Sequence, residues 1–340
     1  CRATGRRLLS RTGPCLYPRL PRLAGTTGVA RAGVVALLLL LALCWSQASE
    51  EVQARKQECT AKGGGGCTPD CAEMAQQEWN YLDLAKIRAT LIRQEDTILF
   101  HLIERAQFKR NPCVYQEGAQ FLEGTGIEGS YAQHLLKETE TIHSRARRYT
   151  SPDEKPFTPV VELPASTLPP LIVPENMKYL QSIDVNINPK LYGLYSTKII
   201  NEICKEGDDG QYGSAAVCDI LTLQALSKRI HYGTFVAESK FISQPEEYTR
   251  LIKAGDRDGI MALLTNSEVE ERVIKRVQRK ATAYGQEITD EDSQVHGPAL
   301  TEEELKYFKV NPEVMGRLYR DMIIPLTKEV EVDYLMQRAS

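Results

Sequence analysis

The 340-residue chain lacks the short motifs that mark most enzyme classes. It has no GxGxxG loop after a strand, no HExxH pair for zinc, and no Ser, His and Asp in the order of a nucleophilic triad. Its five histidines are scattered, and Cys59, Cys67 and Cys71 have no fourth metal ligand near them in the sequence. We therefore expect neither a metal nor a cofactor.

Patterns of period two, which are typical of strands, are also absent almost throughout. Apolar residues instead recur at helical spacings, so we predict an all-α fold with one large helical-bundle domain. Seven of the seventeen prolines fall in residues 151–174, which we expect to be an extended surface connector. The predicted helices span about 82–110, 130–149, 189–205, 214–241, 246–254, 256–265, 267–284 and 312–337, the last with a kink at Pro325.

Acidic residues are missing from positions 1–49, which hold seven Arg and no Lys. The remainder carries 35 basic and 45 acidic residues, a net charge of about −10, which argues against a nucleic-acid partner. The apolar run 34–45 has only twelve residues, too few for a stable membrane span. We predict a targeting presequence at 1–49, a linker rich in Gly and Cys at 50–80, and the functional domain at 81–340. The Arg-rich leader favours a plastid, and the apolar run keeps a secretory or cytosolic destination open.

Three pairs of polar residues share helix faces beside apolar stripes. Arg229 and Lys240 are eleven residues apart, which is close to three helical turns. Asn266 and Glu270 are four apart, and so are Thr327 and Glu331. Long cationic side chains often rest their stems on apolar surface and keep their charge in water. The alternative interpretation is a buried site for an anion with at least two acceptor groups.

Single charged residues on the first helix differ in their expected surroundings. Arg88 lies on its apolar side, where a cation is costly unless an anion meets it. Arg93, Asp96 and Arg105 have room to be solvated. His231 neighbours Arg229 and could be a base, but a hydrogen-bonded structural histidine is the simpler interpretation.

A second basic cluster, Arg145, Arg147 and Arg148, ends the helix that we expect to begin at an N-cap, Ser130. These arginines could simply favour the helix C-terminus through its dipole. The Gly-rich loop 207–214 leads into the next helix, with Ser214 as its expected N-cap. The glycines could serve the turn alone, or the free N–H groups could bind a carboxylate together with Arg147 and Arg148.

Three separated segments resemble the eukaryotic, plant- and fungal-type, all-helical chorismate mutases. They read LAKIRATLIRQEDTILFHLIE at 84–104, RIHYG at 229–233 and PLTKEVEVDYL at 325–335. The resemblance covers about 82–338, and 207–219 looks more like the plant branch than the fungal one. It implies a homodimer that rearranges chorismate to prephenate on the way to Tyr and Phe.

The resemblance also implies roles for individual residues. Arg88 and Arg229 would hold the two carboxylates of chorismate, and Lys240 and Glu331 would face its ether oxygen. To donate a proton there, Glu331 must have a pKa raised by burial. The remaining polar groups would be bound by Asn266, Glu270 and Thr327.

Arg147, Arg148, Gly213 and Ser214 match positions that hold an aromatic amino acid in the family. Val217 departs from the Thr of fungal relatives and agrees with the plant pattern, for which we expect activation by Trp and inhibition by Tyr or Phe. Two alternatives remain: a non-catalytic helical dimer that senses aromatic amino acids, and a mutase that is secreted.

Overall fold

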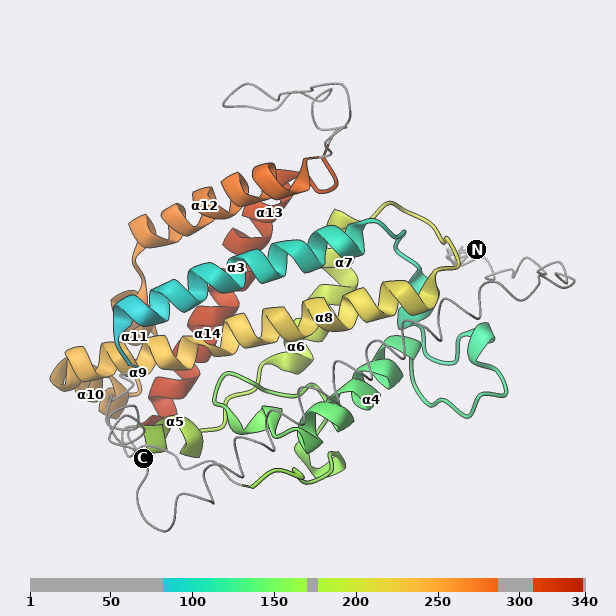
Figure 1. Cartoon of the computed structure of the whole chain (residues 1–340). Coiled ribbons are helices and arrows are strands. Elements are labelled where there is room, and N and C mark those ends of the chain that lie inside the picture. Colours follow the sequence, from blue (N-terminus) through green and yellow to red (C-terminus); the bar gives the residue numbers. More distant parts are fainter. Residues whose placement is uncertain (1–81, 170–176, 287–307, 339–340) are drawn as a thin grey trace, which may run out of the picture. The chain divides into compact units, whose positions relative to one another are not determined.

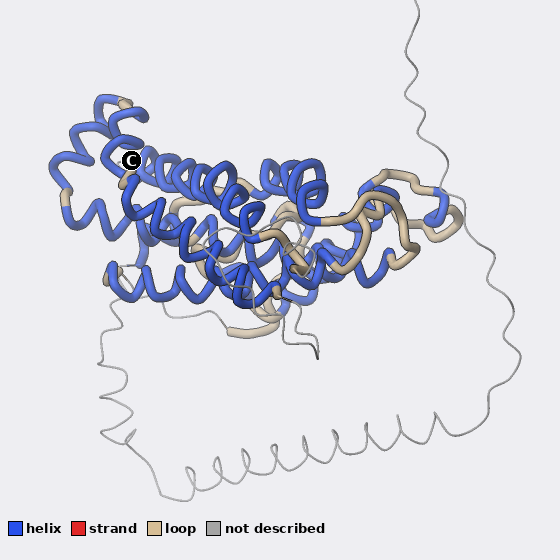
Figure 2. Tube along the Cα trace, turned by 90° about the horizontal axis from the view of Figure 1, so that it is seen from above, coloured by secondary structure: helices blue, strands red, loops and turns tan. Residues whose placement is uncertain are grey.

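The computed structural model describes residues 82–169, 177–286 and 308–338, which belong to one compact unit, Asn80–Ser340. The predicted presequence and linker, and most of the acidic loop 286–304, lie outside the described residues. Helices and loops make up the described part, which contains no strand (Figure 2). The prediction of an all-α fold is confirmed.

Long helices surround the buried core, and α3 (Leu84–Ala106) runs beside α8 (Tyr212–His231) (Figure 1). α14 (Ile324–Arg338) packs against α8 and α9 (Gly233–Ser243), and α12 (Ser267–Gly285) packs against α3. The other α-helices are α4 (Tyr131–Arg145), α5 (Lys178–Ser182), α6 (Asn188–Leu194), α7 (Ile200–Ile203), α10 (Pro245–Ala254), α11 (Arg257–Leu264) and α13 (Pro312–Leu318).

Short helical turns complete the described chain. Two of them are π-helical, at Tyr195–Ile199 between α6 and α7 and at Tyr319–Ile323 between α13 and α14, just before Pro325. The 3₁₀ turns are Pro112–Tyr115, Gln120–Leu122, Arg148–Thr150 and Val160–Glu162. None of the described helices combines the length and the apolar composition that crossing a bilayer requires.

Side-chain caps begin several of the described helices, α4 and α3 among them, but not α8. The Ser130 hydroxyl accepts the Gln133 N–H, and the Gln133 side chain accepts the Ser130 N–H, so the predicted N-cap of α4 is confirmed. The Asp83 carboxylate caps α3 in a similar way. The prediction that Ser214 caps α8 is wrong, because α8 already begins at Tyr212, after Gln211.

Two other expectations are corrected. The segment 214–241 is two helices rather than one, because α8 ends at His231 and α9 begins at Gly233 after the single residue Tyr232. Arg105 is not solvated. Its side chain has no exposed surface, and its guanidinium donates to Asp219 at 2.5 Å and to the carbonyls of Lys109 and Arg110. These hydrogen bonds join Arg105 to the backbone that follows α3. The helix ends earlier than predicted, at Ala106.

Candidate functional site

A cavity of about 380 Å³ lies among α3, α8, α9, α12 and α14, and we call it the central cavity. Apolar side chains such as Leu91, Val236 and Ile324 form part of its wall. All seven side chains that the sequence assigned to substrate line it: Arg88, Arg229, Lys240, Asn266, Glu270, Thr327 and Glu331. The structure therefore brings together residues from four separate parts of the chain.

Arg229 is the most buried cation of the central cavity, with 5% of its surface exposed. It lies in the last turn of α8, and its Nε and Nη1 atoms are buried without a hydrogen-bond partner. Glu95 also acts electrostatically on Arg229, but its carboxylate accepts two hydrogen bonds from Arg276, at 2.6 and 2.8 Å. Burial lowers the pKa of Arg229 below its ordinary value. An arginine nevertheless stays charged in proteins, so this guanidinium is prepared for an anion.

Lys240 and Glu331 face each other across part of the cavity. The Lys240 Nζ atom is 3.8 Å from the Glu331 Oε2 atom, too far for a hydrogen bond, and it donates to the Leu264 carbonyl at 2.7 Å. Glu331 Oε2 is buried and has no hydrogen-bond partner. The two side chains can therefore both approach one oxygen atom of a ligand.

Burial raises the pKa of Glu331 to about 7, although Lys240, Arg229 and Lys328 act in the opposite direction. Removing a carboxylate from water penalises its charged form, and here that effect exceeds the attraction of three cations. Near neutral pH the side chain can therefore carry a proton and donate a hydrogen bond. The predicted direction of the shift is confirmed.

Two further side chains that line the cavity, those of Thr327 and Asn266, make hydrogen bonds within their own helices. The Thr327 hydroxyl donates to the Ile323 carbonyl at 2.7 Å. The Asn266 side-chain oxygen accepts the Val269 N–H at 3.0 Å and so caps α12. These hydrogen bonds fix the positions of both side chains before any ligand binds.

Sequence reasoning missed Lys328, whose Nζ atom lies 3.1 Å from one oxygen of Glu270 and 3.4 Å from the Thr265 hydroxyl. This ion pair joins α14 to α12 beside the central cavity. Lys328 directly follows Thr327, which was a signal for its place near the site. The pairing with Glu270 could not be read from the sequence, because nothing in the two segments fixes their distance.

Gly233 lets α9 approach α14 closely. A Cβ atom at this position would lie 3.0 Å from both the carbonyl oxygen and the Cγ2 atom of Thr327, and 3.2 Å from the Cγ atom of Glu331. The missing side chain thus allows the start of α9 to lie directly against Thr327 and Glu331 on α14.

Arg88 occupies a different position from the other cations. Arg88 lines the central cavity, but it is exposed to solvent on α3. Leu84 and Leu91 line the same cavity, so Arg88 lies on the apolar side of α3 as expected, but its exposure places it at the edge of the cavity.

The four predicted effector residues do not meet within one chain. Arg148 donates to Glu154 at 2.6 Å and to the Gln224 side chain at 3.2 Å. Ser214 and Gly213 are exposed in the first turn of α8, ten residues or more before Gln224. At 1.5 Å per residue this separation is about 15 Å. Arg147 lies beyond α4 in a left-handed conformation and donates to the Pro169 carbonyl.

His231 holds the end of α8 rather than facing the cavity. It is fully buried, and its Nε2 atom accepts the Ile187 N–H at 3.1 Å while Nδ1 lies 2.8 Å from the Ser227 carbonyl. Burial lowers its pKa to about 4, so the ring is neutral. The interpretation of His231 as a structural histidine is confirmed.

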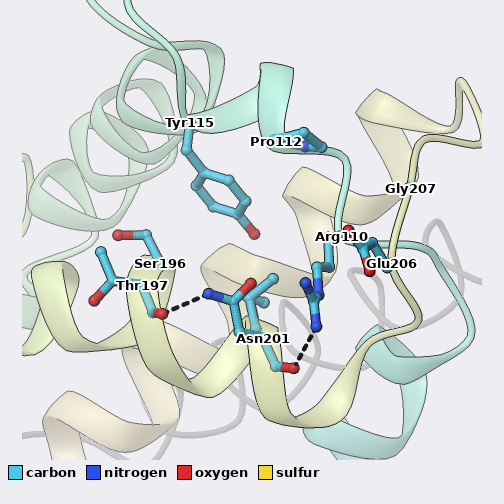
Figure 3. Close-up of a pocket in the computed structure, with 9 residues that line it drawn as sticks. Arg110, Pro112, Tyr115, Ser196, Thr197, Asn201, Glu206 and Gly207 are labelled. Carbon is cyan, nitrogen blue, oxygen red and sulfur yellow. Dashed lines mark hydrogen bonds between the residues drawn. The ribbon is translucent and has the colours of Figure 1, made fainter. Parts of the chain in front are cut away.

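A second cavity, of about 470 Å³, lies between the residues after α3 and the helices around Tyr195–Ile199 (Figure 3). Arg110 is the single cation among its described lining residues, and it donates to the Asn201 carbonyl at 3.0 Å. The Asn201 amide donates to the Thr197 carbonyl at 2.6 Å. This cavity offers one cation where the central cavity gathers several, so it is less suited to a doubly charged anion.

Comparison with known proteins supports the family resemblance that the three sequence segments indicate. Residues 211–332 match the family model described as chorismate mutase type II. Over 261 residues the chain is 45% identical to chorismate mutase 3, chloroplastic, from Arabidopsis thaliana, which covers 77% of this chain and 79% of that protein.

Two solved structures extend the similarity to three dimensions. AtCM1 with tyrosine bound in its allosteric site is 43% identical, with a TM-score of 0.67, and the match covers 78% of this chain and 99% of that one. Aro7p chorismate mutase from Candida albicans, in complex with L-Trp, is 40% identical, with a TM-score of 0.65 and coverage of 76% and 92%.

Proposed function

Since this chain belongs to the type II chorismate mutase family and is a chorismate mutase, an isomerase, we propose that the central cavity is its active site. Chorismate would bind there and rearrange to prephenate. The alternative of a non-catalytic sensor gives no reason for several cations to gather around one cavity.

Binding of the substrate would rest on two guanidinium groups. Arg229, deep in the cavity, would take one carboxylate of the dianion, and Arg88, at the edge, would take the other. The planar fork of an arginine binds a carboxylate through two charge-assisted hydrogen bonds, which fixes its orientation. Holding the substrate in a folded conformation lowers the entropic part of the barrier.

Acceleration of the bond exchange would come from Lys240 and Glu331. Negative charge grows on the ether oxygen as the C–O bond breaks, and a cation already in place stabilises that charge more than it stabilises the substrate. Protonated Glu331 would donate a second hydrogen bond to the same oxygen. No covalent intermediate is needed, because the rearrangement is intramolecular.

The observation that carries this proposal is the pair of buried Arg229 nitrogen atoms without a partner. Its test is the loss of chorismate absorbance with purified full-length protein. Lys240→Gln should lower kcat by about 10²–10³, the usual effect of removing one preorganised donor. The matched control Lys253→Gln, at an exposed position in α10, should keep wild-type kcat. Wild-type kcat in Lys240→Gln would exclude the central cavity.

Regulation by aromatic amino acids would require a second copy of the chain. Arg148 and Ser214 lie too far apart in one chain to hold one amino acid together, whereas two chains could supply one group each. On the surface that includes Ser214, the side chains of Val217 and Leu221 are 49% and 44% exposed, and Ile142 on α4 is 65% exposed. Covering these apolar groups would favour a homodimer.

This part of the proposal has its own test. Sedimentation should find a dimer, and Trp should raise the activity while Tyr or Phe lowers it. Arg148→Ala should lose the response. A monomer that responds fully would contradict the shared site.

We also propose that the chain is directed to a plastid, as the name of the Arabidopsis relative states for that protein. The mature N-terminus recovered from purified plastids should begin after residue 49. Recovery of the protein only from the medium would support the secretory alternative instead.

A further inference from the structure

A carboxylate joins the proposed effector arginine to the end of α8. The two oxygens of Glu154 accept hydrogen bonds from different cations. Oε2 accepts one from Arg148 Nε at 2.6 Å, and Oε1 accepts one from Lys228 Nζ at 2.5 Å. The Glu154 side chain is only 12% exposed, so water screens these pairs less than it screens surface pairs.

Lys228 has a particular place in the helix, because the next residue is Arg229. Both lie in the last turn of α8, and the Lys228 Nζ atom is also 3.6 Å from the Asp153 carboxylate. An ionic cluster, formed by Arg148, Asp153, Glu154 and Lys228, therefore joins this turn to the segment around Glu154, where the Ser227 hydroxyl also donates to the Lys155 carbonyl at 3.4 Å.

Arg148 has little freedom to bind a further carboxylate without changing this cluster. Its Nη1 atom already faces the Gln224 oxygen and the His143 ring, each at 3.2 Å. A carboxylate that binds an arginine through two hydrogen bonds commonly uses adjacent nitrogen atoms of the fork. Glu154 holds Nε, so an incoming carboxylate at the Nε side must displace it.

We propose that Glu154 is a positioning residue that couples the effector site to Arg229. The α-carboxylate of a bound amino acid takes Arg148 from Glu154, and Glu154 is then left with Lys228 alone. The last turn of α8 adjusts to the altered cluster and moves Arg229 relative to the rest of the central cavity. This inference rests on the proposed effector role of Arg148.

Two substitutions separate competition from coupling in the full-length protein. Glu154→Gln keeps the shape and removes the charge, so Trp or Tyr should bind about three- to tenfold more tightly by calorimetry. The change in kcat/KM that the amino acid causes should fall to less than half. Lys228→Met leaves Arg148 paired, so binding should stay within about twofold of wild type while the response is lost.

The control is Glu162→Gln, because Glu162 pairs with Lys137 at an exposed position on the same connector. It should change neither binding nor response. If amino acids bind and both variants respond as the wild type does, Glu154 has no coupling role and the effector site stands. If no aromatic amino acid binds the wild-type protein, the effector site and the coupling fall together.

Discussion

Two buried arginines, Arg105 on α3 and Arg229 on α8, show how one residue type serves two purposes. Arg105 contacts Asp219 on α8, and its guanidinium also donates to three backbone carbonyls and to Tyr115. Arg229, near the end of the helix, is almost as buried, but its Nε and Nη1 atoms have no partner.

Their pKa values shift in opposite directions for this reason. Burial alone would lower the pKa of Arg105, but Asp219, Tyr115 and Cys204 together outweigh burial and raise it. Burial lowers the pKa of Arg229, and its more distant anionic neighbours do not outweigh it. A buried cation whose donors all have partners stabilises the fold, whereas the unpaired donors of a buried cation remain available to a ligand.

Removing the unpaired arginine should affect catalysis most. Arg229→Ala should lower kcat/KM by about 10³–10⁴, the loss of two charge-assisted hydrogen bonds. Its free energy of unfolding should stay the same or rise, because a buried charge without a partner is removed. Chorismate assays and urea unfolding measure the two effects. Arg279→Ala, exposed on α12, is the control. A large loss of stability without a loss of activity would reverse the assignment.

Removing the paired arginine should give the opposite result. Arg105→Ala leaves Asp219 buried without its cation and should cost about 3–5 kcal/mol of unfolding free energy. The kcat/KM of the folded fraction should change little. Arg93→Ala, exposed on the same helix, should stay within about 0.5 kcal/mol of wild type. An unchanged urea midpoint in Arg105→Ala would show that the Asp219 network does not stabilise the fold.

A third substitution disturbs the central cavity without touching its charges. The Cβ of Gly233→Ala would crowd Thr327 and Glu331, which should cost about 1–3 kcal/mol of stability and lower kcat several-fold. Gly193→Ala is the matched control, because no heavy atom beyond its chain neighbours and the backbone of its own helix lies within 4 Å of its Cβ position in α6. Equal behaviour of the two variants in thermal unfolding and activity would show that α9 and α14 can separate without loss.

A further expected effect concerns the proton on Glu331. The pKa of Glu331 is about 7, so about one tenth of its side chains carry a proton at pH 8. Wild-type activity at pH 8 should therefore be about tenfold lower than at acidic pH, where Glu331 is fully protonated, because the charged form cannot donate to the ether oxygen. Glu331→Gln keeps a neutral donor and should remove this alkaline decline. Glu329→Gln, two residues away, should keep it. An alkaline decline that persists in Glu331→Gln would assign it to another group.

Helical spacing was enough to pair six of the polar side chains of the central cavity. Asn266 with Glu270, and Thr327 with Glu331, are pairs on single helices, so local geometry fixes their common direction. Arg229 and Lys240 reach the same cavity although Tyr232 separates their helices. The short interruption does not turn either residue away from the cavity.

Contacts between distant segments could not be predicted in this way. Arg105 was expected in solvent because it lies off the apolar stripe predicted for its own helix, and its partner Asp219 is 114 residues away. The pairing of Lys328 with Glu270 across 58 residues was missed for the same reason. A residue's environment depends on tertiary packing, which the pattern along one helix does not contain.

The cap on α12 restricts the kind of atom that the central cavity can accept at one point. Because the carbonyl oxygen of the Asn266 side chain is turned to the Val269 N–H, its NH₂ group is the end left for a guest molecule. Whatever part of the guest lies there should therefore offer lone pairs rather than hydrogens. The capping of a helix thus determines that this part of the cavity presents a hydrogen-bond donor.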